Sequence, residues 1–382
     1  MARIVLSSCL FRYPMGGMLS WLLQYLVGFQ RLGHEVVYVE RVMRANDCFD
    51  TPRQVMGDDP SHGLRTAGAL LERHGLGDVW HFADIAGQCY GLPRARVAEA
   101  FASADVFLDV GGDASWLDEA AHAGLRVLVD CEPGFTQMRM EAHAEAGKPW
   151  PEYDRYYSTG LNLGSDAAAL PRAGKTWHTL QDPIVPDLFP VEPAKPDAPF
   201  TTVMSWQSMR TRVWRGRSYG NKDLEFARFE ELPQRTRVPL EMAVSGRDVP
   251  WERLGEIGWQ LKNAYRVSTS FEGYADYVRG SRGEFSVAKQ CYVATNSGWF
   301  GDRAAVFLAS GRPVVMQDTG WSAHFPCGEG LFAVTSPEEA ADALEAVVGD
   351  YAHHARRARE LALEHFDASK IFARLLDEVG VA

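Results

Sequence analysis

Residues Gly298 to Leu331 read GWFGDRAAVFLASGRPVVMQDTGWSAHFPCGEGL. The first part of this segment predicts a short helix over Asp302 to Ser310 that ends at Gly311. An apolar run from Pro313 to Met316 predicts a buried strand, and a polar turn from Gln317 to Ser322 follows it directly. Open α/β sheets bind ligands where the carboxyl end of a strand opens into such a turn. Because free backbone N–H groups in a turn suit phosphate, the segment predicts a nucleotide-type ligand.

The length and charge of the chain limit its architecture and its partners. A chain of 382 residues is more consistent with two domains than with one. Hydrophobic residues make up 46% and charged residues 23%, which is ordinary for a globular protein. The formal net charge of −11 argues against broad binding to nucleic acid or to an anionic membrane, because both require a net basic surface. We therefore expect no nucleic-acid partner.

The cysteines and the apolar segments bear on the location of the protein. The six cysteines include no CxxC pair, which argues against a zinc knuckle or a redox dithiol: Cys9, Cys48, Cys89, Cys131, Cys291 and Cys327. The chain opens with a strand pattern, Arg3 to Leu6, and not with a signal peptide. The most apolar stretch, Met18 to Phe29, is too short to span a bilayer. We expect reduced thiols, a cytoplasmic location and no membrane span.

The first half begins with a β–turn–α–β pattern. Ile4 to Ser8 predicts a buried strand, and Gly16 and Gly17 lie in the turn that follows. Apolar residues at helical spacing then run to Phe29. This is the first unit of a doubly wound sheet. The two glycines serve either as a tight turn or as a place where a phosphate approaches the backbone.

A proline-rich segment separates this half from a second one with the same pattern. Six prolines fall between residues 182 and 199, which excludes a helix or a central strand. Strand patterns restart at Phe200 to Ser205 and Leu240 to Val244. The predicted fold class is α/β, with two Rossmann-like doubly wound domains facing each other across a cleft. The predicted divisions are an N-terminal domain at 1–190, a linker at 191–199, a second domain at 200–365, and a C-terminal helix at 366–382 that packs back on the first domain.

Basic residues cluster after the strand pattern Phe200 to Ser205, among Trp206, Trp214 and Tyr219. The cluster consists of Arg210, Arg212, Arg215, Arg217 and Lys222. Arginine binds phosphate oxygens in a bidentate manner, and aromatic rings stack on bases, so the cluster predicts contact with a phosphorylated ligand. The alternative is a solvated loop or a patch for an acidic partner.

Two carboxylates follow strand patterns in the first half. Asp113 comes after the strand that ends near Val110, and Glu132 comes after the next one. A carboxylate at a strand end that faces a cleft can act as a general base. The alternative for each is a helix cap or a loop salt bridge. His178 and His324 are weaker candidates, because most single histidines are structural or exposed.

Three familiar motifs fail or are missing. Gly174-Lys175-Thr176 resembles the end of a P-loop, but Ala169 stands where the first glycine is required and Pro171 lies inside the loop. The chain has no GxGxxG, which disfavours a dinucleotide oxidoreductase. It has no Asp-x-Asp either, so a metal-bridged diphosphate site of that kind is not supported, and we expect no bound metal.

The motifs of the second half resemble a known family. They run from Gly311-Arg312-Pro313-Val314-Val315 through Asp318-x-Gly320 and Gly328-Glu329-Gly330-Leu331 to Ser336-Pro337-Glu338-Glu339-Ala340. This order is similar to the C-terminal half of nucleotide-sugar glycosyltransferases of the GT-B fold. The resemblance implies that the second domain binds the donor and the first domain binds the acceptor.

The resemblance also implies roles for single residues. Asp318, Thr319, Gly320, Trp321 and Ser322 would lie near the donor sugar or diphosphate. Lys222 and Arg210 would bind the diphosphate, and Gly16 and Gly17 would approach it from across the cleft. Many relatives carry a Glu-x7-Glu pair, but these positions fall on Gly298 and Val306 here, so Asp302, with Arg303 beside it, would take the ribose contact.

The leading hypothesis is therefore a glycosyltransferase of the hexosyltransferase class. It would move a sugar from a nucleotide-diphosphate sugar to a hydroxyl or amine on a small-molecule or glycan acceptor, with no metal and no cofactor besides the donor. Asp113 or Glu132 would be the general base if the reaction inverts configuration. Two alternatives stay open: a nucleotide-sugar hydrolase or epimerase of the same fold, and a non-catalytic protein that binds a nucleotide sugar.

Overall fold

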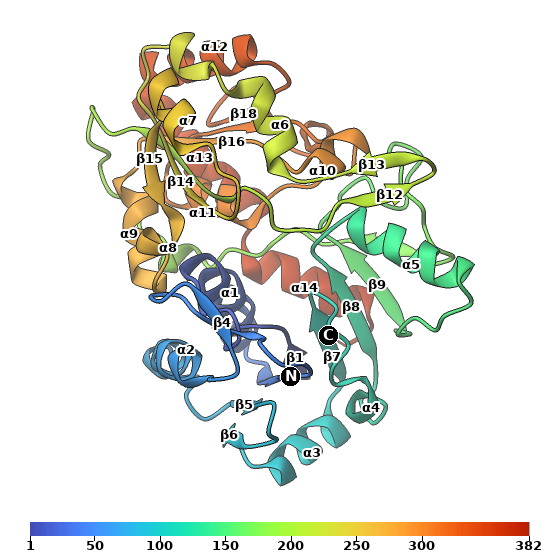
Figure 1. The fold of residues 1–382 in the computed structure, drawn as a ribbon. Helices are drawn as coiled ribbons and strands as arrows, with labels where there is room; N and C mark the ends of the chain where they lie inside the picture. The colour runs from blue at the N-terminus through green and yellow to red at the C-terminus, as the bar shows by residue number, and fades with distance from the viewer. Residues whose placement is uncertain (382) are drawn as a thin grey trace.

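The computed structural model describes residues 1–381 and contains two parallel sheets, one in each half of the chain (Figure 1). This confirms the predicted α/β fold class with two Rossmann-like domains. Among the described residues, no helix combines the length and the apolar character needed to cross a bilayer. The six cysteines are free thiols.

The larger sheet belongs to the N-terminal half and has the strand order β10-β9-β8-β7-β1-β2-β5-β6. Its strands are β1 (Arg3–Ser7), β2 (Glu35–Arg41), β5 (Trp80–Ala83), β6 (Cys89–Gly91), β7 (Val106–Val110), β8 (Arg126–Asp130), β9 (Arg155–Ser158) and β10 (Trp177–Thr179). The accompanying helices are α1 (Gly16–Arg31), α2 (Ser61–Arg73), α3 (Arg94–Ser103), α4 (Leu117–Ala120) and α5 (Phe135–Glu145), with a small hairpin of β3 (Cys48–Asp50) and β4 (Val55–Gly57). Only the β5–β6 pair within this sheet is antiparallel. The chain starts at β1 in the middle, extends to one edge and returns through β7, so the direction of winding reverses between β1 and β7.

The smaller sheet belongs to the C-terminal half and has the order β15-β14-β11-β16-β17-β18. Its strands are β11 (Phe200–Ser205), β14 (Leu240–Ser245), β15 (Gln260–Asn263), β16 (Gly283–Ser286), β17 (Val314–Gln317) and β18 (Leu331–Val334). A separate hairpin consists of β12 (Arg212–Trp214) and β13 (Arg217–Tyr219). The helices are α6 (Lys222–Phe229), α7 (Trp251–Ile257), α8 (Ala264–Val267), α9 (Phe271–Gly280), α10 (Gln290–Ala294), α11 (Asp302–Ala309), α12 (Pro337–Gly349), α13 (Tyr351–His365) and α14 (Ala368–Glu378). Here the winding reverses between β11 and β16.

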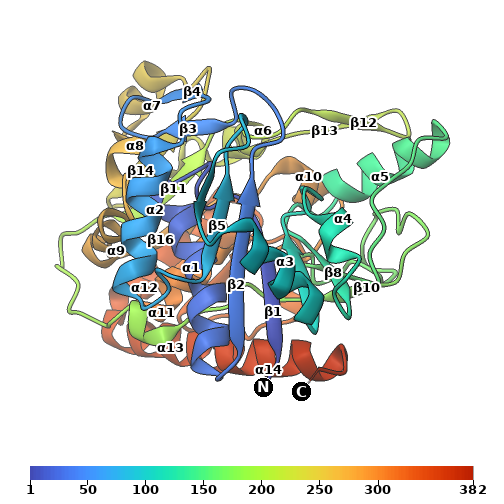
Figure 2. The same ribbon diagram turned by 90° about the horizontal axis from the view of Figure 1, so that it is seen from below.

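The last helix, α14, crosses from the C-terminal half to the N-terminal sheet (Figures 1 and 2). Phe372 stacks on Phe29 of α1, with ring centroids 3.9 Å apart, and both side chains are fully buried. A side chain at Gly28 would collide with the Phe372 ring, so the glycine allows the two helices to approach closely. Asp367 accepts a hydrogen bond from Ser369 N–H and begins the helix, at the break that the sequence predicts.

The two halves also touch at the N-terminal end of α1. Gly16 N–H donates to Ser268 O at 2.8 Å, and Gly17 N–H donates to Ser268 Oγ at 3.3 Å. A Cβ on Gly16 would lie 2.4 Å from Ser270 O and 2.6 Å from Tyr274 Cβ, whereas a Cβ on Gly17 would have no protein atom within 4 Å. Gly16 is therefore needed for the close contact between the halves, and Gly17 is not.

This contrast gives a matched pair of substitutions. Gly16→Ala should lower the free energy of unfolding by about 1–3 kcal/mol, because the methyl group overpacks a contact that includes backbone. Gly17→Ala should leave it unchanged or raise it by about 0.4–1 kcal/mol, because alanine restricts the unfolded chain. Urea unfolding of the two variants and the parent tests this expectation. Equal stabilities of the two variants would show that the chain around Ser270 and Tyr274 accommodates the added methyl group with no loss of free energy.

Candidate functional site

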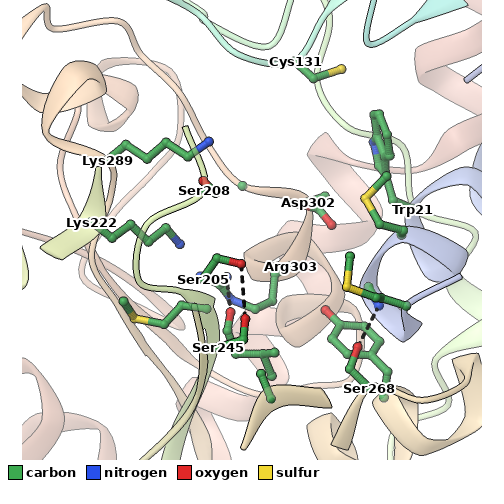
Figure 3. A pocket seen from close by; sticks show the side chains of 18 of the residues that line it. Trp21, Cys131, Ser205, Ser208, Lys222, Ser245, Ser268, Lys289, Asp302 and Arg303 are labelled. Atoms are coloured by element: carbon green, nitrogen blue, oxygen red, sulfur yellow. Dashed lines mark hydrogen bonds between the residues drawn. The ribbon is translucent and has the colours of Figure 1, made fainter. Parts of the chain in front are cut away.

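A cavity of about 320 Å³ lies between the two halves (Figure 3). Its volume falls within the range of small-molecule sites, roughly 300–1,000 Å³. The N-terminal half contributes the start of α1, the residues that follow β8, and Asp182. The C-terminal half contributes the segments after β11 and β16 and the start of α11. The cavity thus lies beside the point where each sheet reverses its winding, which is where open α/β sheets bind ligands.

One side of the cavity is cationic and is formed by Lys222, Lys289 and Arg303 (Figure 3). Lys222 is buried and forms no ion pair with any described residue, and its ammonium group lies 5.9 Å from the centre of the Trp299 ring. Burial, together with the charges of Arg303 and Lys289, holds the pKa of Lys222 well below its usual range. An anion bound here would restore the charge on this lysine.

The other two cations already have partners. Arg303 pairs through Nε with the fully buried Glu284 and donates from Nη1 to Val203 O at 2.6 Å. Lys289 Nζ lies 2.6 Å and 2.5 Å from the two carboxylate oxygens of Glu132, which come from the opposite half of the molecule. The Tyr292 hydroxyl donates to Glu132 as well. Glu132 therefore joins the two halves across the cavity.

The structure brings together five of the residues that the sequence singled out: Gly17, Lys222, Glu132, Asp302 and Arg303 all line the cavity. Gly16 lies directly beside them, but its backbone N–H and that of Gly17 are occupied by Ser268. A phosphate could use these two N–H groups only by displacing Ser268.

The turn from Asp318 to Ser322 lies outside the cavity lining, and two of its backbone N–H groups already have a partner within the turn. Gly320 N–H and Ser322 N–H both donate to Asp318 Oδ1, and Ser322 Oγ donates to Asp318 Oδ2. Thr319 Oγ1 donates to Trp299 O, and the Trp321 side chain is fully buried. The carboxylate of Asp318 thus binds two N–H groups of the turn from within, and Thr319 holds the backbone at Gly298 and Trp299.

The basic cluster is also not a unit in the folded protein. Arg210 is exposed, and the neighbouring arginines lie on the β12–β13 hairpin, outside the cavity lining. This hairpin reaches α5 of the other half, where Trp214 Nε1 and Arg215 contact Glu141. Of the five basic residues, Lys222 alone lines the cavity.

Asp113 does not line the cavity either. Its carboxylate lies 2.5 Å from Arg12 Nη2 and accepts a hydrogen bond from Ser115 N–H. Arg12 is buried and also pairs with Glu40 and Asp47. The salt-bridge alternative therefore describes Asp113.

Neither histidine candidate lines the cavity. His324 Nε2 lies 2.8 Å from Asn162 Oδ1, and His178 packs against Tyr157. Both contacts are those of structural side chains.

The polar cavity residues that the sequence reasoning missed include Asp182, Lys289 and Tyr292. Lys289 follows β16, a four-residue strand with the sequence GEFS that has no apolar run to mark it. A search for basic residues after each predicted strand would not have found Lys289, because β16 itself was not predicted. Asp182 lies in the proline-rich segment and contacts Trp21 of α1, a contact that the sequence pattern does not indicate.

A second cavity, of about 430 Å³, lies in the N-terminal half beside β2, β5 and α3. Arg41 on its wall pairs with Glu119, with Nη1 at 2.8 Å from one carboxylate oxygen, and stacks over Trp116. Asp84 accepts hydrogen bonds from Ala86 N–H and Gln88 N–H. Because its charged side chains have protein hydrogen-bond partners and it lies within one half, we regard the interdomain cavity as the principal site.

Comparisons with known proteins agree with this arrangement. No protein-family model matches the chain, and no curated protein sequence matches it. The crystal structure of HepE (Alr3699) from Anabaena in complex with UDP and glucose matches over 100% of both chains, with 13% identity and a TM-score of 0.56. An alpha-glucosyltransferase in complex with UDP and a 13-mer DNA containing an HMU base matches over 99% of both chains, with 11% identity and a TM-score of 0.59. The chain therefore has the GT-B fold, as its motifs suggested.

Proposed function

We propose that this protein transfers a sugar from a nucleotide-diphosphate sugar to a hydroxyl or amine acceptor. The observation that carries the proposal is the buried, unpaired Lys222 in a cavity between two doubly wound domains. An unpaired buried ammonium group is costly unless a ligand supplies the counter-charge. UDP and UDP-glucose are bound by solved structures of this fold, including HepE and the alpha-glucosyltransferase, which supports a nucleotide diphosphate as that ligand.

In the proposed reaction the bond between the anomeric carbon and the diphosphate oxygen breaks. A bond from the same carbon to the acceptor oxygen or nitrogen forms, and the proton of the acceptor passes to a base. Lys222 and Lys289 would stabilise the negative charge that grows on the leaving diphosphate. Arg303, held by Glu284, would keep the cavity wall in place and add positive potential.

We assign the role of base to Glu132, because it is the one carboxylate of the two candidates that lines the cavity. In the free protein it is held by Lys289 and Tyr292. A bound diphosphate would compete for Lys289 and so release the Glu132 carboxylate toward the acceptor. The acceptor would be a small molecule or a glycan. The reaction would require no cofactor in addition to the nucleotide-sugar donor.

Calorimetry with UDP, GDP, ADP and dTDP, each with and without EDTA, tests donor binding. We expect one nucleotide to bind with a Kd in the micromolar range, typical of enzyme substrates at roughly 1 μM–1 mM, and EDTA to leave it unchanged. No binding by a folded sample would overturn the proposal, and loss of binding in EDTA would overturn its metal-free form. Incubation with the matching nucleotide sugar, with and without a mixture of acceptor sugars, then separates transfer from hydrolysis: release of free sugar at the same rate in both would favour a hydrolase.

A further inference from the structure

The cavity contains a pair of carboxyl groups that the diphosphate contacts leave unused. Asp182 comes from the proline-rich segment and Asp302 from the start of α11, and both line the cavity. Figure 3 shows Asp302 and Trp21 on the side of the cavity away from Lys222 and Lys289. The ends of the cavity therefore differ in charge, so a bound diphosphate would turn toward the lysines and away from the carboxyl groups.

The two carboxyl groups have few protein partners. Asp182 is 7% exposed, and its Oδ1 accepts a hydrogen bond from Trp21 Nε1 at 2.8 Å. Its Oδ2 has no hydrogen-bond partner in the part of the chain that the structure describes. The carboxyl group of Asp302 accepts from the backbone N–H of Arg303 and has no hydrogen bond to another side chain among residues 1–381. Buried polar groups without partners are uncommon, and oxygens that face a cavity are available to a ligand.

The protonation of the pair follows from its surroundings. Burial, with a further contribution from the charge of Asp302, raises the pKa of Asp182 to about 8. Burial also raises the pKa of Asp302, and Arg303 and Lys222 oppose this shift. The other titratable groups near Asp182 are Tyr25 of α1 and Cys131 after β8, and burial raises the pKa of each so far that both stay neutral. With a pKa of about 8, Asp182 keeps its proton at neutral pH and offers a hydrogen-bond donor, and the oxygens of Asp302 offer acceptors.

We propose that Asp182 and Asp302 together bind a pair of neighbouring hydroxyl groups on one ring of the donor, either the ribose or the transferred sugar. A carboxylic acid beside a second carboxyl group complements a diol, because each hydroxyl can both donate and accept. The neighbouring Trp21 ring adds apolar surface for the C–H face of such a ring. This inference rests on the proposed nucleotide-sugar site, and it makes Asp182 a positioning residue for the donor.

Asparagine at position 182 is a useful variant, because its oxygen can still accept from Trp21 while its N–H replaces the proton of the acid. Alanine removes both groups. Asp187→Asn, at an exposed ion pair with Arg31, is the matched control. Calorimetry compares UDP, 2′-deoxy-UDP and UDP-glucose at pH 6.5 and pH 9 for the four proteins. The affinities of two ligands are compared as a ratio at one pH. Because all three ligands carry a diphosphate, the ratio cancels the effect of other groups, including Lys222, whose titration changes diphosphate binding.

If the pair binds the ribose, Asp182→Ala should reduce the preference for UDP over 2′-deoxy-UDP by up to about tenfold, the upper value for one hydrogen bond between uncharged groups. If the pair binds the transferred sugar, Asp182→Ala should instead reduce the preference for UDP-glucose over UDP by the same factor. In either case the parent protein should lose the preference at pH 9, where Asp182 ionises, and Asp182→Asn should keep it. If Asp182→Ala changes neither affinity ratio and the parent protein binds UDP, the inference is wrong and the proposed donor site is unaffected. Failure of the parent to bind UDP would instead count against the proposed donor site.

Discussion

Lys222→Met is expected to weaken the binding of the nucleoside diphosphate by roughly 100-fold. The lysine is buried without a carboxylate partner, so the ligand supplies its counter-charge in a region of low dielectric. A charge-assisted hydrogen bond of this kind contributes about 3 kcal/mol, which corresponds to the stated factor. Calorimetry on the variant gives the measurement. Arg210→Met is the control: the residue is basic and close in sequence, but it is exposed and outside the cavity, so its loss should change the affinity less than about threefold.

The depressed pKa of Lys222 adds a second observable with a definite sign. In the free protein the ammonium group loses its proton at a lower pH than in the unfolded chain, and a bound anion raises its pKa again. Binding should therefore take up protons, and the affinity should fall as the pH rises through the pKa of the free protein. The measured enthalpy should vary with the ionisation enthalpy of the buffer in the parent and not in Lys222→Met.

The same shift predicts a gain in stability for the variant. Between the lowered pKa of folded Lys222 and the unfolded pKa of lysine, about 10.4, the unfolded chain binds more protons at this site than the folded chain does. The resulting cost to stability is fully present below the folded pKa and disappears as the pH rises through the unfolded pKa. Folding therefore loses free energy at neutral pH, and methionine removes that loss while filling similar space. Lys222→Met should unfold at a higher urea concentration than the parent although it binds the ligand less well. A variant that is both less stable and weaker in binding would indicate a structural role for Lys222 instead.

Local sequence patterns predicted much of the fold. The strand Phe200 to Ser205 coincides with β11, and the helix Asp302 to Ser310 coincides with α11 to within one residue. These elements were readable because apolar periodicity and the glycine after the helix act within a few residues of each other. By contrast, β16 buries Glu284 through its ion pair with Arg303, so its strand pattern depends on a residue nineteen positions away.

The site residues that could be predicted are those whose place after a predicted strand already puts them at the edge of a sheet. Glu132 directly follows β8, and the carboxyl edge of a parallel sheet brings such residues to the cavity. Lys222 begins α6, the first helix after β11, and so reaches the same edge of its own sheet. The turn at Asp318 has the expected sequence, but its carboxylate binds two of the N–H groups, at Gly320 and Ser322. The motif thus identified the fold, and its role in ligand binding stays a prediction. Asp182 could not be found from the sequence, because its neighbours Trp21 and Asp302 lie far from it along the chain.

Glu132→Gln is expected to lower the rate of transfer by about 10²–10⁴-fold if Glu132 is the base. The amide keeps the shape of the side chain but cannot accept the proton of the acceptor. The side chain is 35% exposed, so the fold should tolerate the change. Single-turnover assays with saturating donor measure the chemical step separately from binding.

The required control is Lys289→Met, because both substitutions break the same contact across the cavity. Lys289→Met removes the cation and leaves the carboxylate, so it should weaken donor binding while it retains far more of the single-turnover rate than Glu132→Gln does. Glu132→Gln should show the reverse, because it leaves Lys289 free for the diphosphate but removes the base, and Asp113, the other candidate, lies outside the cavity lining. Asp113 is held by Arg12, so Asp113→Asn should have little effect on the rate. If Glu132→Gln and Lys289→Met reduce the rate equally, the pair acts only to hold the two halves together, and the base must be sought elsewhere.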